Sequence, residues 1–553
     1  APSNLQAQAL SGSQIMLTWR DNSDNELGFE IQRSEDWVNF ATVTRVRADV
    51  TSYIDRGLQP GTLYSYRVRA FNAEGNSEWS NVASETTLAQ VDVSEYRIYR
   101  ANLHAHTRYS DGAENIAIAH AGVPLHLIAF TDHGEQLSVE EWIDTLTFTN
   151  RIGNAPWVLR GFEWTNTCCS SERGCWTGIG CSVWAAINPT TMRGQGHINV
   201  YNTASRVGAY ATGDNPNDLR TDLQSFYAWL ASAQPYFNNI PVIAQFNHPS
   251  LYDFSGHFEI GNVPFRLPDG ELGERLREIF ALMELGSHCG LRCYEGAGAP
   301  GDPNSSNEHW YRHALNMGWR VAPTNNQDNH LPLTTLRSKP FTGILLKSWE
   351  DPTDAEDAQR TFLNALSRRR TFASEDKNST IVLVGRLSGD AVWSYLMGNL
   401  VMLPESGFGD LVLGIGANNP KDSVLTTRDY IERIELIGPA NTVLYQRTGL
   451  GSQSFSASIT LSESTLRSLP RTYAGELYFY AKMVQADGDV VISAPIWVKL
   501  VGGQFVYDPR NQPPAEGACD ELFPPIELQF EPLPIEEPES LDQQFVPSKG
   551  EKR

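Results

Sequence analysis

The chain has 553 residues, more than a single hydrophobic core usually supports, so we expect about three folded units. Its formal net charge is −22, from 65 acidic and 43 basic residues, and the basic run that stands out is Arg368 to Arg370. Such a surface repels polyphosphate backbones, which argues against nucleic-acid binding, and no apolar run approaches the roughly 20 residues of a membrane-spanning helix.

The start of the chain and its cysteines favour an oxidising compartment. The sequence begins at Ala1 without a methionine or a charged and apolar leader, as in a mature protein whose signal peptide has been removed. Four of the seven cysteines lie between Cys168 and Cys181, and Cys289 and Cys293 are four residues apart. We therefore expect a secreted protein, extracellular or periplasmic, with disulfides of open connectivity and Cys519 unpaired. A thiolate zinc site is the alternative.

Residues 1–88 alternate apolar and polar side chains in short runs such as "QIMLTW" and "GFEIQRS", separated by turns. This spacing predicts a β-sandwich. Trp19 on an early strand, "LQPGT" before Tyr64, and the strand "YSYRVRAFN" resemble a fibronectin type III domain over this whole region. The resemblance implies a spacer or adhesive module, which contacts another subunit or a surface, and not a catalyst.

Residues 95–378 change to apolar strands separated by helix-length segments. Predicted helices are "VEEWIDTLTFTNRI", "LRTDLQSFYAWLASA" and "SNEHWYRHALNMG", the last with Gly318 at its C-cap. Seven strands that alternate with helices predict a closed parallel barrel. The predicted strands are "YRIYRANLH", "LIAFTDH", "WVLRGFEW", "GHINVYN", "PVIAQFNH", "FALMELG" and "RVAPTNN".

Residues 379–502 return to alternation, as in "YIERIELIG", "ELYFYAKMVQ" and "VVISAPIWVKLV", and predict a second β-sandwich. Residues 503–553 are rich in proline and glutamate, a composition typical of disorder, although they can also be held against a surface or a partner.

Histidines and carboxylates follow the predicted strands of residues 95–378. His104 and His106 are two residues apart, so their side chains share one face of a strand. The later segments add Asp111, Asp132, His133, Glu163, His197, His248, Asp328 and His330. The carboxyl ends of parallel strands meet at one mouth of a barrel, where so many acids and imidazoles would repel or desolvate one another unless cations held them.

Imidazole and carboxylate ligands without thiolate suit Zn, Mn or Fe, and this many ligands exceeds what one tetrahedral ion uses. We therefore expect two or three divalent metal ions. Each of these residues alone is more often a surface or core residue, so the prediction depends on their joint pattern.

These residues resemble the polymerase and histidinol phosphatase (PHP) family in order and type: H-x-H with a downstream acid, then D-H, E, H, H and D-x-H. The similarity covers about residues 100–375. It implies a distorted (β/α)7, TIM-like barrel with a trinuclear site, here flanked by two all-β sandwiches. By this resemblance one metal is held by His104, His106, Glu163 and Asp328, a second by Asp111, His133 and His330, and a third by Glu163, His197 and His248.

A narrower resemblance concerns "ALSRRRTFASEDKNS" after the barrel and "SAPIWV" in the last sandwich. Both look like the branch of the PHP family that includes carbaryl hydrolase, a carbamate-cleaving enzyme.

We expect a hydrolase that uses a metal-bridging hydroxide, most simply a phosphomonoesterase or phosphodiesterase acting on a small molecule. A carboxyl-ester or carbamate hydrolase with the same metals is one alternative, and a non-catalytic extracellular binding or assembly protein is another. Asp132, Arg292 and His257 are predicted catalytic residues, with Arg292 as a cation at the rim and His257 as a proton donor to the leaving group. Glu284 is either a rim acid or a strand residue paired with a neighbour.

Overall fold

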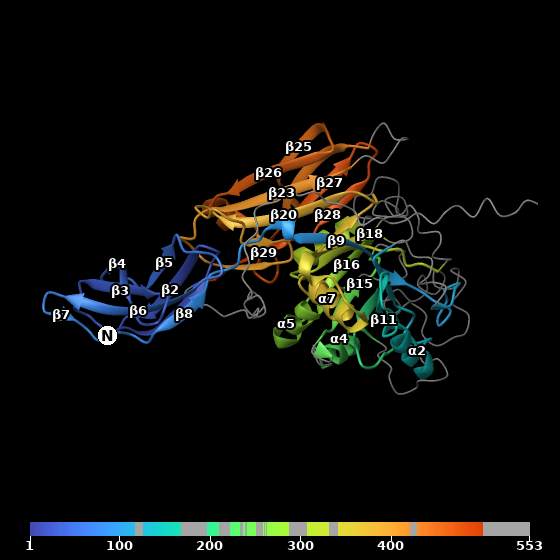
Figure 1. Cartoon of the computed structure of the whole chain (residues 1–553), viewed down its shortest axis with the longest axis horizontal. Coiled ribbons are helices and arrows are strands. Elements are labelled where there is room, and N and C mark those ends of the chain that lie inside the picture. The colour runs from blue at the N-terminus through green and yellow to red at the C-terminus, as the bar shows by residue number, and fades with distance from the viewer. Residues whose placement is uncertain are drawn as a thin grey trace, which may run out of the picture.

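The structure is a computed structural model that describes residues 1–116, 125–166, 196–208, 222–232, 236–237, 240–249, 258, 260, 263–286, 307–330, 341–420 and 429–501. Over these residues the chain is a multidomain protein that is rich in β-sandwiches and has six α-helices. Figure 1 shows the N-terminal sandwich in blue at one end of the molecule, and a second sandwich in orange beside a central region of strands and helices.

The N-terminal sandwich has two sheets, and its prediction from the sequence is confirmed. Trp19, Phe29 and Tyr66 lie in its core because alternate residues of each strand face inward. The Tyr64 hydroxyl accepts a hydrogen bond from the Gln59 N–H at 3.0 Å and so fixes the turn before the longest strand. One sheet contains β1 (Ser3–Ala9), β2 (Gln14–Arg20) and β5 (Ser52–Arg56); the other contains β4 (Ala41–Arg47), β3 (Gly28–Ser34), β6 (Leu63–Asn72), β7 (Gly75–Asn76) and β8 (Ala83–Thr86).

This sandwich is hydrogen-bonded to the C-terminal one. Asp390 is buried, and its Oδ1 accepts hydrogen bonds from Ser13 Oγ at 2.5 Å and Gln14 Nε2 at 3.0 Å. The Tyr395 hydroxyl donates to the Leu10 carbonyl. Buried polar groups are costly unless they are paired. These hydrogen bonds therefore hold the two sandwiches together in addition to the covalent linker.

The central region is one curled sheet. Its strands from β9 to β17 are hydrogen-bonded in chain order, and β18 and then β19 continue the sheet on the other side of β9. The twist of a sheet lets it curl until its ends meet, and here β17 contacts both β18 and β19. The Asn325 N–H donates to Thr342 Oγ1 at 2.9 Å, and Ala105 forms a parallel bridge with Asn329. The strands are β9 (Tyr96–Ala105), β10 (Leu127–Phe130), β11 (Trp157–Asn166), β12 (Gly196–Tyr201), β15 (Ile243–Phe246), β16 (Phe280–Gly286), β17 (Ala322–Asn325), β18 (Phe341–Lys347) and β19 (Thr371–Ser374).

The expectation that the seven predicted strands all run parallel is wrong for one of them. β12 runs antiparallel to both β11 and β15, whereas β9, β10 and β11 are mutually parallel, as are β15, β16 and β17. A buried strand reads as the same apolar run in either direction, so its sequence does not fix its direction. The first residues of β12 therefore lie at the same edge of the sheet as the last residues of its neighbours.

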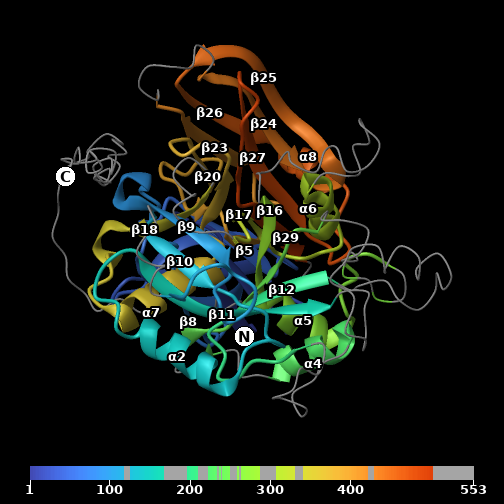
Figure 2. The ribbon, with the colours of Figure 1, turned by 90° about the vertical axis from the view of Figure 1, so that its right-hand side faces the viewer.

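Five helices cover the outside of this sheet, and Figure 2 shows them around its periphery. α2 begins with a capping box between Ser138 and Glu141, and α5 buries Leu276 and Ile279 against the sheet. The backbone at Gly318 has a φ of 97°, the left-handed conformation expected after α6. The helices are α2 (Val139–Thr149), α4 (Leu223–Ser232), α5 (Gly270–Ile279), α6 (Asn307–Asn316) and α7 (Ala355–Ser367).

The C-terminal sandwich is continuous with the curled sheet, because β19 pairs antiparallel with β28. The domain boundary predicted at 378/379 thus falls shortly after β19, a strand that pairs with both the curled sheet and the C-terminal sandwich. One layer contains β21 (Tyr395–Leu396), β20 (Thr380–Leu387), β23 (Leu411–Asn418) and β26 (Ser454–Leu461). The other contains β25 (Thr442–Ser452), β24 (Ile431–Gly438), β27 (Leu477–Gln485), β28 (Val490–Ser493), β29 (Ile496–Val501) and β22 (Leu400–Pro404).

The remaining elements are short. They are the hairpin of β13 (Tyr236–Phe237) and β14 (Ile240–Pro241), the helix α8 (Glu463–Ser468), and three turns of 3-10 helix at Val93–Glu95, Ser348–Glu350 and Pro439–Asn441. The seven cysteines and the proline-rich segment 503–553 lie outside the described residues, so the predicted disulfides and tail stay predictions.

Candidate metal centre

The nine predicted metal ligands all lie among the described residues, and the fold brings them together at one edge of the curled sheet. Four sets of three or four side chains each place one nitrogen or oxygen per residue within 4.8 Å of one another. Three of these sets contain predicted ligands alone. They are His106, Asp111, His133 and His330; His104, His106 and Asp328; and Glu163, His197 and His248.

Glu163, on β11, is the centre of this arrangement. Its side chain is 1% exposed, and its oxygens lie 3.3 Å from His104 Nε2, 3.0 Å from His133 Nδ1 and 3.2 Å from His197 Nδ1. The Asn247 amide donates to its Oε1 at 2.8 Å. Within the described residues, every ion pair of this carboxylate is with a histidine.

Asp111 joins a second group of rings at the outer side of the cluster. Its carboxylate lies 3.3 Å from His106 Nδ1, 3.4 Å from His133 Nε2 and 3.3 Å from His330 Nε2. Asp111 is in a loop, so its position depends on the turn that follows β9 and not on strand geometry.

Asp328 connects the first two histidines of the chain. Its Oδ1 lies 3.3 Å from His104 Nε2 and 3.1 Å from His106 Nε2. The backbone at Asp328 has a φ of 45°, a conformation that an aspartate adopts at some cost and that clusters at functional sites.

His197 reaches the cluster by a different route from the other histidines. It is the second residue of β12, which is antiparallel to its neighbours, so it lies at the start and not at the end of its strand. The sequence prediction that such residues follow the carboxyl ends of strands is therefore wrong for His197, although its ring still lies in the cluster.

Burial and charge oppose each other at these rings. Burial alone lowers the pKa of His104 and of His133, but the adjacent carboxylates outweigh it and raise both pKa values well above the ordinary histidine range. Burial also lowers the pKa of His106, which hydrogen bonds to Asp111 and Asp328 raise to about 9. Burial raises the pKa of Glu163, and the surrounding histidines lower it well below its usual value. The carboxylates thus need positive charge beside them, which protons or metal ions can supply.

Asp132 does not share this environment. Its Oδ1 accepts hydrogen bonds from the Thr107 N–H at 2.7 Å and Ser110 Oγ at 2.7 Å, and its Oδ2 accepts from Thr107 Oγ1 at 2.8 Å. Both oxygens thereby hold the turn that carries Asp111. These contacts show that Asp132 orders the turn; its catalytic role, predicted from the sequence, stays a prediction.

Two residues around the cluster were not identified from the sequence: Thr165, whose Oγ1 lies 2.7 Å from His133 Nδ1, and Asn247, which donates to Glu163. Glu284, which the sequence offered as a rim acid or a paired strand residue, is buried beside His104. Asn247 and Thr165 are close in sequence to predicted ligands, which is the signal that could have found them. Arg292 and His257 lie outside the described residues, so their predicted roles stay predictions.

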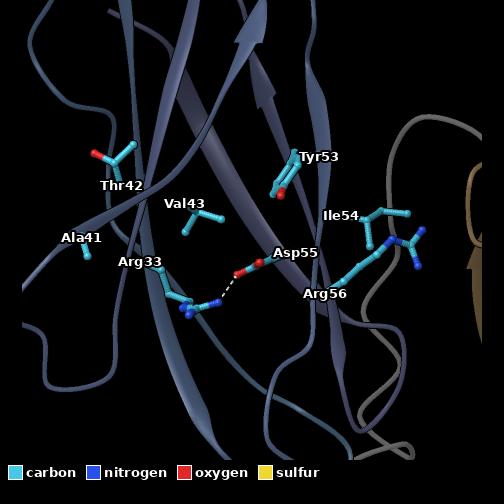
Figure 3. A pocket seen from close by; sticks show the side chains of 8 residues that line it. All are labelled: Arg33, Ala41, Thr42, Val43, Tyr53, Ile54, Asp55 and Arg56. Carbon is cyan, nitrogen blue, oxygen red and sulfur yellow. Dashed lines mark hydrogen bonds and ion pairs between the residues drawn. The ribbon is translucent and has the colours of Figure 1, made fainter. Parts of the chain in front are cut away.

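A shallow hollow on the N-terminal sandwich is far from this chemistry. Figure 3 shows that Arg33 points toward Asp55 across the hollow and pairs with it at 2.9 Å. This pairing neutralises both charges, and the cluster at the curled sheet remains the candidate site.

Comparison with known proteins concerns the N-terminal sandwich. Residues 1–86 match the fibronectin type III domain family. This region is a fibronectin type III domain. Among curated proteins, an alpha-amylase of Niallia circulans is 40% identical over 98 residues, which is 17% of this chain and 7% of that protein. Exoglucanase B of Cellulomonas fimi is 32% identical over 88 residues, 16% of this chain and 7% of that protein. The chain thus spans less than a tenth of either relative.

Solved structures resemble the chain over a similar share. A crystal structure of FN3tt is 23% identical, covers 16% of this chain and 94% of its own, and has a TM-score of 0.14. A beta-1,2-glucanase from Parabacteroides distasonis is 25% identical, covers 17% of this chain and 14% of its own, and has a TM-score of 0.15. No helix among the described residues is long and apolar enough to cross a membrane.

Proposed function

We propose that the protein is a multinuclear metal-dependent hydrolase, and that its curled sheet and helices form the distorted (β/α)7 barrel of a PHP domain. The observation that carries this proposal is the convergence of six imidazoles and three carboxylates from separate stretches of the chain, six of these nine side chains being buried. Isolated buried charges are expensive, so a cluster of this kind is consistent with bound cations.

The residues fit divalent metals. Glu163 and Asp111 pair with histidines and not with lysine or arginine within the described part of the chain, so no permanent cation balances them there. Imidazole nitrogens with carboxylate oxygens suit Zn, Mn or Fe. Two or three ions would be held by these ligands. The resemblance to the PHP family assigns Glu163 to two of the ions, in keeping with its distances of 3.3 Å to His104 Nε2 and 3.2 Å to His197 Nδ1.

Metal ions at such a site lower the pKa of water toward neutrality and neutralise charge on the attacked centre. The chain's own residues keep the ligands in place. Asp132 orders the turn that carries Asp111, Thr165 orients the His133 ring, and Asn247 orients Glu163.

A phosphomonoester or phosphodiester of a small molecule is the substrate we propose first, in keeping with the resemblance to the PHP family. A carbamate or carboxyl ester is the second candidate. The resemblance of two segments to the carbaryl-hydrolase branch supports it, and these segments lie side by side, since Phe372 pairs with Ser493. We also propose that the protein works outside the cytoplasm, with the fibronectin type III domain as a spacer or contact module.

Elemental analysis of the full-length protein tests the metal site. After reconstitution with Mn or Zn, we expect two or three equivalents per chain, and Glu163→Gln should bind at least one fewer and lose at least roughly 100-fold in activity. Glu30→Gln is the matched control, because Glu30 is a buried carboxylate of the fibronectin type III domain that pairs with Arg45 and Arg69. A wild-type chain that retains no metal at saturation contradicts the proposal.

A substrate screen separates the two chemistries. The reconstituted enzyme should cleave p-nitrophenyl phosphate or its bis-ester and leave aryl acetates and aryl carbamates intact. The opposite pattern would show that the ester or carbamate hydrolase is correct and the phosphoesterase is wrong.

A further inference from the structure

Glu284 is a buried carboxylate directly behind the cluster. It lies on β16 and is 0% exposed. Its Oε1 and Oε2 lie 3.2 Å and 3.3 Å from His104 Nδ1, and its Oε2 also accepts a hydrogen bond from the His248 N–H at 3.1 Å. One side chain therefore contacts two predicted ligands, one in β9 and the other just after β15.

The contact with His104 determines which ring nitrogen faces the cluster. A carboxylate beside Nδ1 keeps a hydrogen on that nitrogen whether the ring is neutral or protonated. The nitrogen left for a metal ion is then Nε2, which faces Glu163 Oε1 and Asp328 Oδ1, each at 3.3 Å. Without the carboxylate, either tautomer and several ring orientations become accessible.

The contact with His248 acts on the backbone. His248 has a φ of 24°, in the left-handed region that disfavours residues with a Cβ. A hydrogen bond to its N–H helps to hold this conformation, in which Nε2 lies 3.6 Å from Glu163 Oε1 and 3.8 Å from Asp328 Oδ2.

We propose that Glu284 is a positioning residue: it holds the hydrogen of His104 on Nδ1, which leaves Nε2 for a metal ion, and it holds the backbone of His248. The inference rests on the proposed metal function. Glu284 also lies near enough to His104 and His248 to be a ligand itself. However, it faces the ring nitrogen of His104 that points away from Glu163 and Asp328, which favours an orienting role.

Metal affinity and metal stoichiometry distinguish these roles. Full-length wild type, Glu284→Gln and Glu284→Leu are titrated with Zn against a chromophoric chelator, and the bound metal at saturation is measured by elemental analysis. We expect Glu284→Gln to bind as many equivalents as wild type, because an amide oxygen still accepts the Nδ1 hydrogen. Its affinity should be 10- to 100-fold lower, because the amide lacks the charge of the carboxylate. Glu284→Leu should lose more affinity, because it removes the acceptor.

Other outcomes overturn the inference. Loss of one equivalent at saturation in Glu284→Gln would make Glu284 a ligand, and affinity equal to wild type in both variants would make it merely structural. Glu30→Gln controls for the loss of a buried carboxylate elsewhere. Circular dichroism with thermal melting shows whether each variant folds, and if Glu284→Leu does not fold, the result for Glu284→Gln decides. Failure of the wild type to bind metal refutes the proposed function itself, whereas a wild type that binds normally beside an unaffected variant refutes the inference alone.

Discussion

Glu476 connects the outside of the curled sheet to the C-terminal sandwich, and its removal should destabilise both. The carboxylate is 1% exposed; it binds Arg320 through Nε at 3.1 Å and Nη2 at 2.5 Å, and it also pairs with Arg277, which is fully buried. Burial raises the pKa of Glu476, but the two guanidinium groups outweigh it and lower the pKa from 4.5 to about 2. This lowering corresponds to about 3 kcal/mol of stabilisation at neutral pH.

Glu476→Gln removes the carboxylate that pairs with Arg320 in the described part of the chain, and it leaves the buried Arg277 with Glu274, which is 60% exposed, as its remaining partner. Breaking a buried pair in this way costs about 3 to 5 kcal/mol, in line with the figure from the pKa. Urea unfolding at pH 7, followed by tryptophan fluorescence and circular dichroism, measures the loss in the free energy of unfolding. Glu356→Gln is the control, because Glu356 is 80% exposed and pairs with Arg360 on the surface of α7, where a pair contributes less than about 1 kcal/mol.

The pH dependence gives a second, independent measurement. A carboxylate whose pKa is lower in the folded state stabilises the protein above the pKa of the unfolded state, and this stabilisation is lost as the pH falls from about 4.5 to about 2. The difference between wild type and Glu476→Gln should therefore shrink across this interval. A loss below about 1 kcal/mol at pH 7, or a difference that does not change with pH, would refute the reasoning.

Three further predictions concern the metal centre and the domain contact. Gly112→Ala would place a Cβ 2.4 Å from the His106 carbonyl oxygen, so the Asp111 turn must shift, and elemental analysis should find weaker occupancy of that metal set with the others retained. Because the pKa of His106 is about 9 without metal, binding of Zn at pH 7 should release protons and affinity should rise with pH up to about 9; a titration in unbuffered solution with a pH indicator that shows no release would contradict this. Asp390→Ala removes the carboxylate that accepts hydrogen bonds from Ser13 and Gln14, which should weaken the association of the two sandwiches by about 1 to 3 kcal/mol. Limited proteolysis should then cut faster between residues 87 and 95, and an unchanged rate would contradict this prediction.

The local pattern of the sequence was sufficient for most of the secondary structure. The alternation over the first strands predicted the N-terminal sandwich, and the H-x-H spacing predicted that His104, in β9, and His106, directly after it, point the same way; their Nε2 atoms lie 3.2 Å apart. These features depend on residues close together in the chain, where backbone geometry alone determines which side chains share a face. Residue type also identified the candidate ligands, since burying imidazoles and carboxylates among apolar residues costs free energy unless a partner compensates for it.

Direction and partnership required the tertiary structure. The antiparallel course of β12 and the pairing of β19 with β28 join segments that are distant in sequence, and an apolar strand carries no mark of its direction or neighbour. The roles of Asp132 and Glu284 likewise depend on which atoms lie within 3.5 Å of each carboxylate. The sequence by itself determined which residues can bind metal; packing of the sheet decided which of them meet and which only hold the others in place.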